Sequence, residues 1–139
     1  MAEAMKVEVV SPERVLFSGE ATQVVTRTME GGEIAFLRGH IPFLGALTES
    51  HTRIYLVDGK VQNLAVHGGF VEVAPDHVVI LSDTAELAED IDVLRARRAK
   101  ERAEEAMRTG SDASVESALR RAHARLTASG GLDTARAGH

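Results

Sequence analysis

The residues that favour turns and aromatic packing are confined to the first part of this chain, and this asymmetry most constrains its fold. All five aromatic residues and all three prolines precede residue 76, and no glycine occurs between Gly69 and Gly110. Glycine and proline mark turns and interrupt helices. The sequence therefore predicts two domains of different secondary structure, residues 1–84 and residues 85–127.

The first domain is expected to be built of short β-strands, because runs rich in Val, Ile and aromatic residues alternate there with turn residues. Asp58-Gly59 separates Arg53–Val57 from Lys60–Val66, and Asp-Gly favours the positive φ angles of a tight hairpin. A second hairpin is predicted between Phe70 and Leu81. Many short strands at this spacing are typical of a β-sandwich or barrel.

The second domain has apolar residues at helical spacing and is predicted to be an antiparallel pair of helices. Asp90 is expected to cap the first helix, Gly110 to end it, and Asp112 to cap the second. Residues 128–139 are rich in small and polar residues and are predicted to be a disordered tail. The apolar residues expected along the two helices are Ile91, Leu94, Ala99, Ala103, Ala106, Met107, Val115, Ala118, Leu119, Ala122 and Leu126.

Composition and charge exclude several classes of protein. The chain has no cysteine, which rules out disulfides and thiolate metal sites. No signal peptide and no apolar run of membrane-spanning length are apparent, so we expect a cytoplasmic protein. Residues 1–86 contain 6 basic and 12 acidic residues, whereas residues 87–139 contain 10 basic and 9 acidic residues, so the first part is acidic and the second is nearly neutral. A nucleic-acid-binding protein normally has a basic surplus on one face, so nucleic acid is not an expected partner.

One stripe on the first predicted helix combines an acceptor with two guanidinium groups. Asp92, Arg95, Ala99 and Arg102 are three or four residues apart and share one helix face. Such a face is suited to a base edge at one end and phosphates at the other. The residue types alone also fit a solvated charged helix face, so this pattern leaves both interpretations open.

Other polar residues do not form a recognisable catalytic or metal site in the sequence. The histidines His51, His67, His77 and His123 lack ligand spacing, so no metal site is predicted. No P-loop and no serine–histidine–acid pattern is present. Glu33 and His40 would suit an acid–base pair, but exposed loop residues are the simpler interpretation.

Several segments, in order, resemble the epsilon subunit of rotary F-type ATP synthases. They are Ser11–Arg14 with Phe17–Ala21, Gly32–Leu44, Gly68–Val73, and Ala85–Asp92. The resemblance covers about residues 5–127, and such a combination of segments is far more specific than a single motif. Ala35 and Arg38 depart from the glycine and proline that are common in the family's rotor-facing loop.

The resemblance implies a ten-stranded β-sandwich followed by a helical hairpin, in a non-catalytic subunit of the central stalk. The family's sandwich binds the gamma subunit and rests on the c-ring, which assigns Glu33 and His40 to the c-ring contact. Its hairpin is folded on the sandwich, or extends to the beta and alpha subunits and blocks ATP hydrolysis, which assigns Arg97, Arg98 and Lys100 to the beta contact. The expected location is the cytoplasmic face of the bacterial membrane, held there only through the proton-translocating complex.

Part of the family also binds ATP as a regulatory ligand in the folded hairpin, with no required cofactor. Ile91-Asp92-Val93-Leu94-Arg95-Ala96 fits that family's motif. The resemblance implies an ATP site formed by Glu86, Ile91, Asp92, Arg95, Arg102, Arg121 and Arg125. The alternative is a free-standing nucleotide-binding sensor that is not part of a rotary motor.

Overall fold

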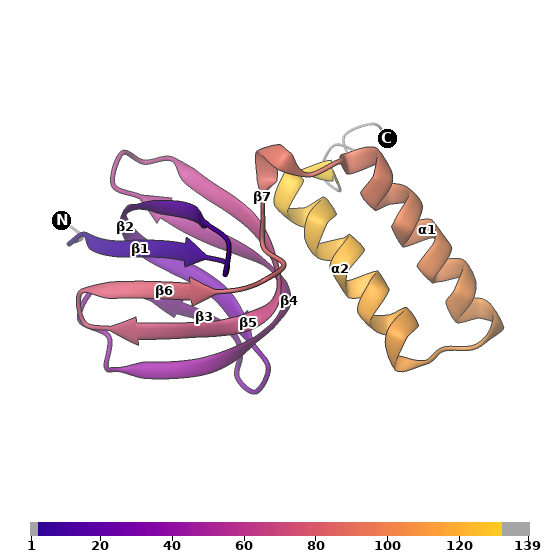
Figure 1. Ribbon diagram of the computed structural model, residues 1–139, viewed down its shortest axis with the longest axis horizontal. Helices are drawn as coiled ribbons and strands as arrows, with labels where there is room; N and C mark the ends of the chain where they lie inside the picture. Colours follow the sequence, from indigo (N-terminus) through magenta and orange to yellow (C-terminus); the bar gives the residue numbers. More distant parts are fainter. Residues whose placement is uncertain (1–2, 132–139) are drawn as a thin grey trace.

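The computed structural model describes residues 3–131, which form a β-domain and a helical hairpin packed against one side of it (Figure 1). The strands are β1 (Met5–Val10), β2 (Val15–Thr28), β3 (Gly32–Phe36), β4 (Phe43–Leu56), β5 (Val61–Ala74), β6 (His77–Leu81) and β7 (Glu86–Leu87). The helices are a short 3-10 turn η1 (Ala88–Asp90), α1 (Val93–Thr109) and α2 (Ala113–Ser129).

The strands of the β-domain form a sheet that closes on itself. The strand order is β1-β6-β5-β4-β2-β3, and β1 also pairs with β2, so that five strands complete a ring. The β1–β6 pair is parallel, and the other pairs are antiparallel. Closure leaves only the short strands β3 and β7 at sheet edges, which limits edge-to-edge association. The predicted sandwich or barrel is confirmed.

The strand count is seven, where the resemblance implied ten, because three strands are long and continuous. β2, β4 and β5 each have 14 residues. β2 pairs with β1 in its first half and with β3 in its second half. β5 likewise pairs with β7 and then with β6. Each of these two strands therefore belongs to both layers of the sandwich.

The β-domain is held by an apolar core drawn from every long strand. Alternating residues of β1 and β6 point inward, as the strand period of two requires. Two threonines are also buried there, and Thr26 Oγ1 lies 2.8 Å from Thr52 Oγ1, so their hydroxyls satisfy one another. The largest fully buried side chains of the β-domain are Phe36, Met5, Ile54, Leu64, Ile80, Val7, Val9, Val24, Val66, Val71 and Val78.

Both helices begin at an aspartate, but the first cap is not the one predicted. Asp92, and not Asp90, caps α1, with Oδ1 accepting the Arg95 N–H at 3.0 Å. Asp90 lies in η1, where the chain is still turning. Asp112 caps α2 as predicted, accepting the Val115 N–H at 3.0 Å. Gly130, with φ 78°, ends α2.

α2 extends to Ser129, so the ordered hairpin is two residues longer than the predicted boundary at 127. Ala128 in this last turn is 5 % exposed and packs in an apolar cluster, which explains why the helix continues. The rest of the predicted tail, residues 132–139, lies outside the described residues.

The hairpin adds two layers to the β-domain, with α2 on β4 and β5 and α1 mainly on α2 (Figure 1). The contact between the helices is made largely by small side chains, and the buried residues of α1 are Ala96 and Ala103. Leu94 is 56 % exposed and Met107 is 38 % exposed, so these two of the apolar residues expected along the helices are not buried. Alanine contacts let the helices approach closely and leave the larger side chains outside.

Candidate functional site

A polar pocket of about 320 Å³ lies where β7, η1 and the two helices meet. Three carboxylates and three guanidinium groups are among its lining residues. We call it the Arg95 pocket, and it is lined by Glu86, Asp90, Asp92, Arg95, Ala96, Ala99, Arg102 and Arg125.

The α1 wall of the Arg95 pocket is the helix stripe recognised in the sequence. Arg95, Ala99 and Arg102 follow one another at helical spacing of three to four residues and face the same space. Asp92 stands at the start of the helix, where one carboxylate oxygen already accepts a backbone N–H. The stripe therefore forms one side of a pocket and is not a uniformly solvated face.

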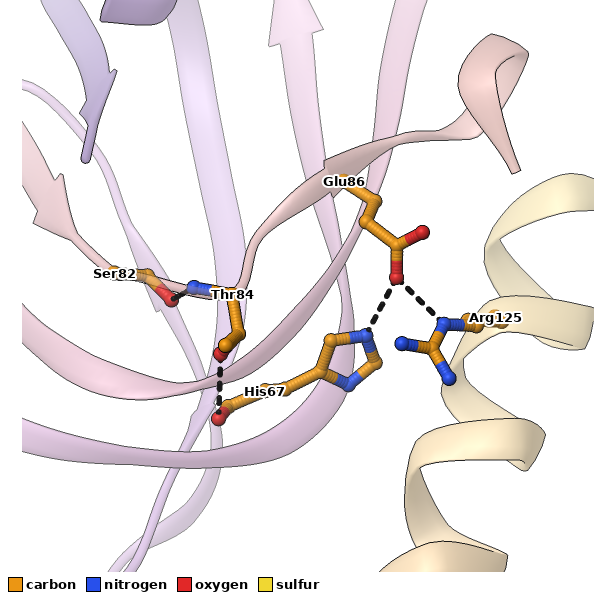
Figure 2. Close-up of polar contacts among 5 residues, drawn as sticks. All are labelled: His67, Ser82, Thr84, Glu86 and Arg125. Carbon is orange, nitrogen blue, oxygen red and sulfur yellow. Dashed lines mark hydrogen bonds and ion pairs between the residues drawn. The ribbon is translucent and has the colours of Figure 1, made fainter. Parts of the chain in front are cut away.

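Glu86 reaches the pocket from the β-domain because a short segment after β6 is fixed to β5. Thr84 Oγ1 donates to the His67 carbonyl oxygen at 3.1 Å, and Ser82 Oγ accepts the Thr84 N–H at 3.3 Å. β7 then pairs with β5. As Figure 2 shows, Glu86 Oε1 lies between His67 Nε2, at 3.0 Å, and Arg125 Nε, at 2.5 Å.

This arrangement keeps Glu86 ionised. The hydrogen bond from His67 lowers the pKa of Glu86 to about 2, opposed by burial and reinforced by the hydrogen bond and charge of Arg125. His67 is buried, with a side chain only 2 % exposed. Arg125 of α2 is thus tied to the β-domain by a charged hydrogen bond, which we call the Glu86–Arg125 contact.

The family of the chain follows from comparison with known proteins. The model of the ATP synthase delta/epsilon chain β-sandwich domain matches residues 4–88, and that of the delta/epsilon chain long α-helix domain matches residues 89–130. The chain belongs to the ATP synthase epsilon-chain family. The chain is a non-catalytic subunit of an enzyme complex. The predicted architecture, a β-domain followed by a helical domain, is also confirmed.

Relatives agree with this family, and a solved structure shares the fold. The ATP synthase epsilon chain of Brevibacillus brevis is 49% identical over 100 residues, covering 72% of this chain and 75% of that one. The epsilon chain of Streptomyces griseus is 44% identical over 128 residues, covering 92% and 97%. A chain of the mitochondrial ATP synthase of Euglena gracilis (OSCP/F1/c-ring) shares the fold with TM-score 0.69 and 22% identity, covering 95% of this chain and 81% of that one.

Two residues that the epsilon-family resemblance assigned to the ATP site lie away from the Arg95 pocket. Ile91 is 8 % exposed and packs with Ala65 and Ala124 between the hairpin and the β-domain. Arg121 donates from Nη1 to Ser117 Oγ at 2.6 Å and does not line the pocket. In this docked form, Ile91 positions the start of α1 and Arg121 stays within α2.

The basic residues expected to meet the beta subunit have different surroundings in the docked hairpin. Arg97 Nη2 donates to the Gly131 carbonyl oxygen at 3.2 Å. Lys100 pairs with Glu104 at 3.2 Å, one turn along α1. Arg98 is exposed. All three lie on α1, the outer helix of the hairpin.

Glu33 and His40, expected to contact the c-ring, do not lie together. Glu33 forms an ion pair with Arg53 at 2.8 Å and lines a cleft against α2. His40 lies in the loop between β3 and β4, with its ring 5.0 Å from that of Phe36. In the same loop, Arg38 donates from Nη1 to the Ala4 carbonyl oxygen at 2.8 Å. These positions do not form an acid–base pair.

Sequence reasoning missed a second polar contact between the hairpin and the β-domain. Glu49 of β4 accepts from Ser117 Oγ at 2.9 Å and from Arg120 Nε at 3.2 Å. Burial opposes ionisation of Glu49, but hydrogen bonds from its own backbone, Ser117, Thr48 and Arg120 outweigh it and lower its pKa to about 2. The partners of this Glu49–Arg120 contact are about 70 residues apart in the sequence, so no local sequence pattern predicts it.

Proposed function

We propose that this chain acts in the central stalk of a proton-translocating ATP synthase, where its β-domain joins the gamma subunit to the c-ring. Its hairpin regulates ATP hydrolysis and binds ATP in the Arg95 pocket when docked. The observation that carries this proposal is the meeting of Glu86, Arg95, Arg102 and Arg125 in one pocket, from the β-domain and both helices.

The charges of the Arg95 pocket suit the two ends of a nucleotide. Guanidinium groups of Arg95, Arg102 and Arg125 can form paired hydrogen bonds with phosphate oxygens. Asp92 offers a carboxylate oxygen to the amino group of a base. A volume of about 320 Å³ is at the small end for ligand pockets, so we expect part of the nucleotide to remain in solvent.

Nucleotide binding is linked to docking because the pocket exists only when its three elements are together. Arg125 is on α2, Arg95 is on α1 and Glu86 is on β7. A ligand that binds only the assembled pocket stabilises it by mass action, by about 2.7 kcal/mol at 100 times its Kd. ATP therefore favours the docked hairpin and opposes inhibition.

The undocked hairpin is the proposed inhibitory form. Leu94 and Arg98 are one helical turn apart and exposed already in the docked form, so they give the start of α1 an apolar and basic surface. Leaving the β-domain would also free Arg120 and Arg125 from their carboxylates. We propose that these groups then contact the beta and alpha subunits.

The β-domain has a separate apolar surface for a partner subunit. Leu44, Phe70 and Leu81 are 70%, 54% and 45% exposed, and strand pairing places Phe70 beside Leu81 and Leu44 beside Glu72. Exposed apolar patches of this kind mark protein interfaces. We assign this surface to the gamma subunit and the β3–β4 loop, with His40 and the exposed Ile41, to the c-ring.

The proposed location is the cytoplasmic face of the bacterial membrane, reached through the complex. Within residues 3–131, neither helix has the length and apolar character that crossing a bilayer requires.

Titration of the purified chain with ATP tests the nucleotide proposal. Calorimetry should detect binding, and Arg95→Ala should weaken it by ~10- to 100-fold, the loss expected for one charged hydrogen-bonding group. Arg108→Ala is the matched control, because Arg108 is on the same helix but outside the pocket. Equal losses in both variants, or no binding by the wild type at millimolar ATP, would exclude the pocket.

Co-purification separates the stalk subunit from a free-standing nucleotide sensor. Co-expressed gamma subunit should elute with the chain, and a Leu44→Asp variant with normal folding should lose it. A sensor that is not part of a rotary motor would bind ATP but leave gamma unbound at micromolar concentration.

A further inference from the structure

A second cleft, of about 290 Å³, lies between the β-domain and α2. Its floor comes from the outer face of β2, β3 and β4, and its wall comes from the last turns of α2. We call it the Arg27 cleft, and it is lined by Arg27, Glu33, Glu49, Ser50, His51, Arg53, His123, Ala124 and Thr127.

The Arg27 cleft is distinct from the Arg95 pocket because the two lie on different sides of α2. His123 lines the cleft and Arg125 lines the pocket. Side chains two residues apart on an α-helix point in nearly opposite directions, since each residue turns the helix by about 100°. A ligand in the cleft therefore has its own contacts.

Strand pairing brings two arginines together on the floor of the cleft. Val25 of β2 is paired with Arg53 of β4, and Arg27 is paired with Glu33 of β3. Arg27 and Val25 are two residues apart, so their side chains share one face of β2. This face is the one that α2 partly covers.

The two carboxylates of the cleft are already paired, which leaves Arg27 as its arginine without a carboxylate partner among the described residues. Glu33 pairs with Arg53 Nη2, and Glu49 pairs with Arg120. Within the part of the chain that the structure describes, Arg27 has no carboxylate partner. Arg53 Nε is buried and has no hydrogen-bond partner there. A buried N–H without a partner is costly and needs an explanation such as a bound ion or water.

We propose that the Arg27 cleft binds a phosphate-class oxyanion through the guanidinium groups of Arg27 and Arg53. Guanidinium groups match the geometry and charge of phosphate oxygens. The cleft is bounded by sheet on one side and helix on the other, and its volume leaves room for an inorganic anion with its water or for a terminal phosphate group. The imidazole of His123 adds a further polar group from α2.

An anion in this cleft strengthens docking of the hairpin, because it contacts β2 and β4 on one side and α2 on the other. This effect is independent of the nucleotide proposal, since none of the cleft residues lines the Arg95 pocket. The two sites together would make the docked form sensitive to both a nucleotide and a free oxyanion.

Nuclear magnetic resonance of the full chain with inorganic phosphate tests this inference. Sodium phosphate replaces sodium chloride at constant ionic strength and pH, so that general salt effects are matched. We expect saturable amide shifts at Arg27, Arg53 and Thr127 at millimolar phosphate, and slower hydrogen exchange in α2. Absence of saturable shifts would overturn the proposal, with water alone then satisfying Arg53.

Two variants should change the phosphate affinity in opposite directions. Arg27→Gln removes one charged donor and should weaken binding by ~10-fold or more. Glu33→Gln releases Arg53 from its ion pair and should strengthen binding. Arg14→Gln is the control of equal charge change, at an exposed turn outside the cleft. Equal weakening by Arg27→Gln and Arg14→Gln would show a non-specific charge effect and overturn the site.

ATP as a second probe identifies the source of the oxyanion. If ATP also shifts Arg53 and Thr127, and still does so in an Arg102→Gln variant, a nucleotide phosphate enters the cleft as well. If phosphate has no effect and the ATP-induced shifts disappear in Arg102→Gln, the shifts in the cleft are an indirect effect of ATP in the Arg95 pocket. The proposal is then wrong. A phosphate effect without ATP binding would support the cleft and reject the nucleotide site.

Discussion

Neutralising Glu49 should weaken docking of the hairpin without removing any residue that lines the Arg95 pocket. Glu49 lies outside that pocket and contacts α2 through Ser117 and Arg120. Glu49→Gln keeps the shape of the side chain and one acceptor oxygen but removes its charge. We therefore expect a lower docked fraction in an otherwise folded protein.

The magnitude follows from the pKa of Glu49. Its fall from 4.5 to about 2 corresponds to roughly 3 kcal/mol favouring the ionised form. Part of this stabilisation comes from Thr48 and the backbone of the same strand, which remain when α2 leaves. Arg120 is half exposed, so solvent screens its contribution. We assign ~1–2 kcal/mol to docking, which is a factor of about 5–30 in the docked-to-undocked ratio.

Hydrogen exchange measures the docked-to-undocked ratio. We expect α2 amides to exchange through undocking and β-domain amides to exchange through global unfolding. Glu49→Gln should speed exchange in α2 by that factor and leave the β-domain unchanged. The control is Glu72→Gln, on β5 away from α2 and with the same charge change. Unchanged α2 exchange, or an equal increase in the β-domain, would refute the assignment of Glu49 to docking.

The pH dependence has a fixed sign. The folded pKa of Glu49 is lowered, so its contribution to docking is present above about pH 4.5 and is lost as the pH falls toward about 2. Glu86 behaves in the same way, because its pKa is also lowered to about 2. Wild-type α2 should therefore lose protection across this range, and Glu49→Gln should lose less, since only Glu86 remains to be protonated.

Four further variants test other parts of the structure. Glu86→Gln should reduce both docking and ATP affinity, measured by hydrogen exchange and calorimetry, because Glu86 contacts Arg125 and lines the Arg95 pocket. Gly69→Ala should lower the free energy of unfolding of the β-domain by several kcal/mol, measured by thermal melting, because φ is +112° and an added Cβ would lie 2.1 Å from the Leu81 carbonyl oxygen. Gly59→Ala is its control and should cost only about 1 kcal/mol, because an added Cβ at Gly59 meets open space. Phe70→Asp should abolish co-purification with gamma and leave the melting temperature of the isolated chain unchanged.

The features that the sequence predicted well are those that depend on neighbouring residues. Asp58-Gly59 forms the expected turn, with φ 91° at the glycine, and the flanking strands pair in register. The stripe from Asp92 to Arg102 faces one pocket because helix geometry alone places those residues together. Gly110 ends the first helix as predicted.

The features that the sequence did not predict depend on tertiary packing. Either Asp90 or Asp92 suits a helix cap, and only the pairing of β7 with β5 decides where the turn ends. Leu94 lies about half a turn around α1 from Ala96 and Ala103, so it faces outward once packing against α2 selects these alanines as the inner face. His67 and Glu49 act through contacts across the β-domain, for which no local signal exists.

The nature of the hairpin contact explains why charged groups and ligands can control it. The apolar cluster between the hairpin and the β-domain consists of Ala65, Ile91, Ala124 and Ala128, and small side chains bury little apolar area. The Glu49 and Glu86 contacts therefore supply a large share of the docking free energy. A shift from 1:99 to 99:1 needs about 5.5 kcal/mol, about twice what a ligand provides at 100 times its Kd. One ligand thus biases the hairpin without fixing it, and full undocking requires partner contacts with exposed groups such as Leu94.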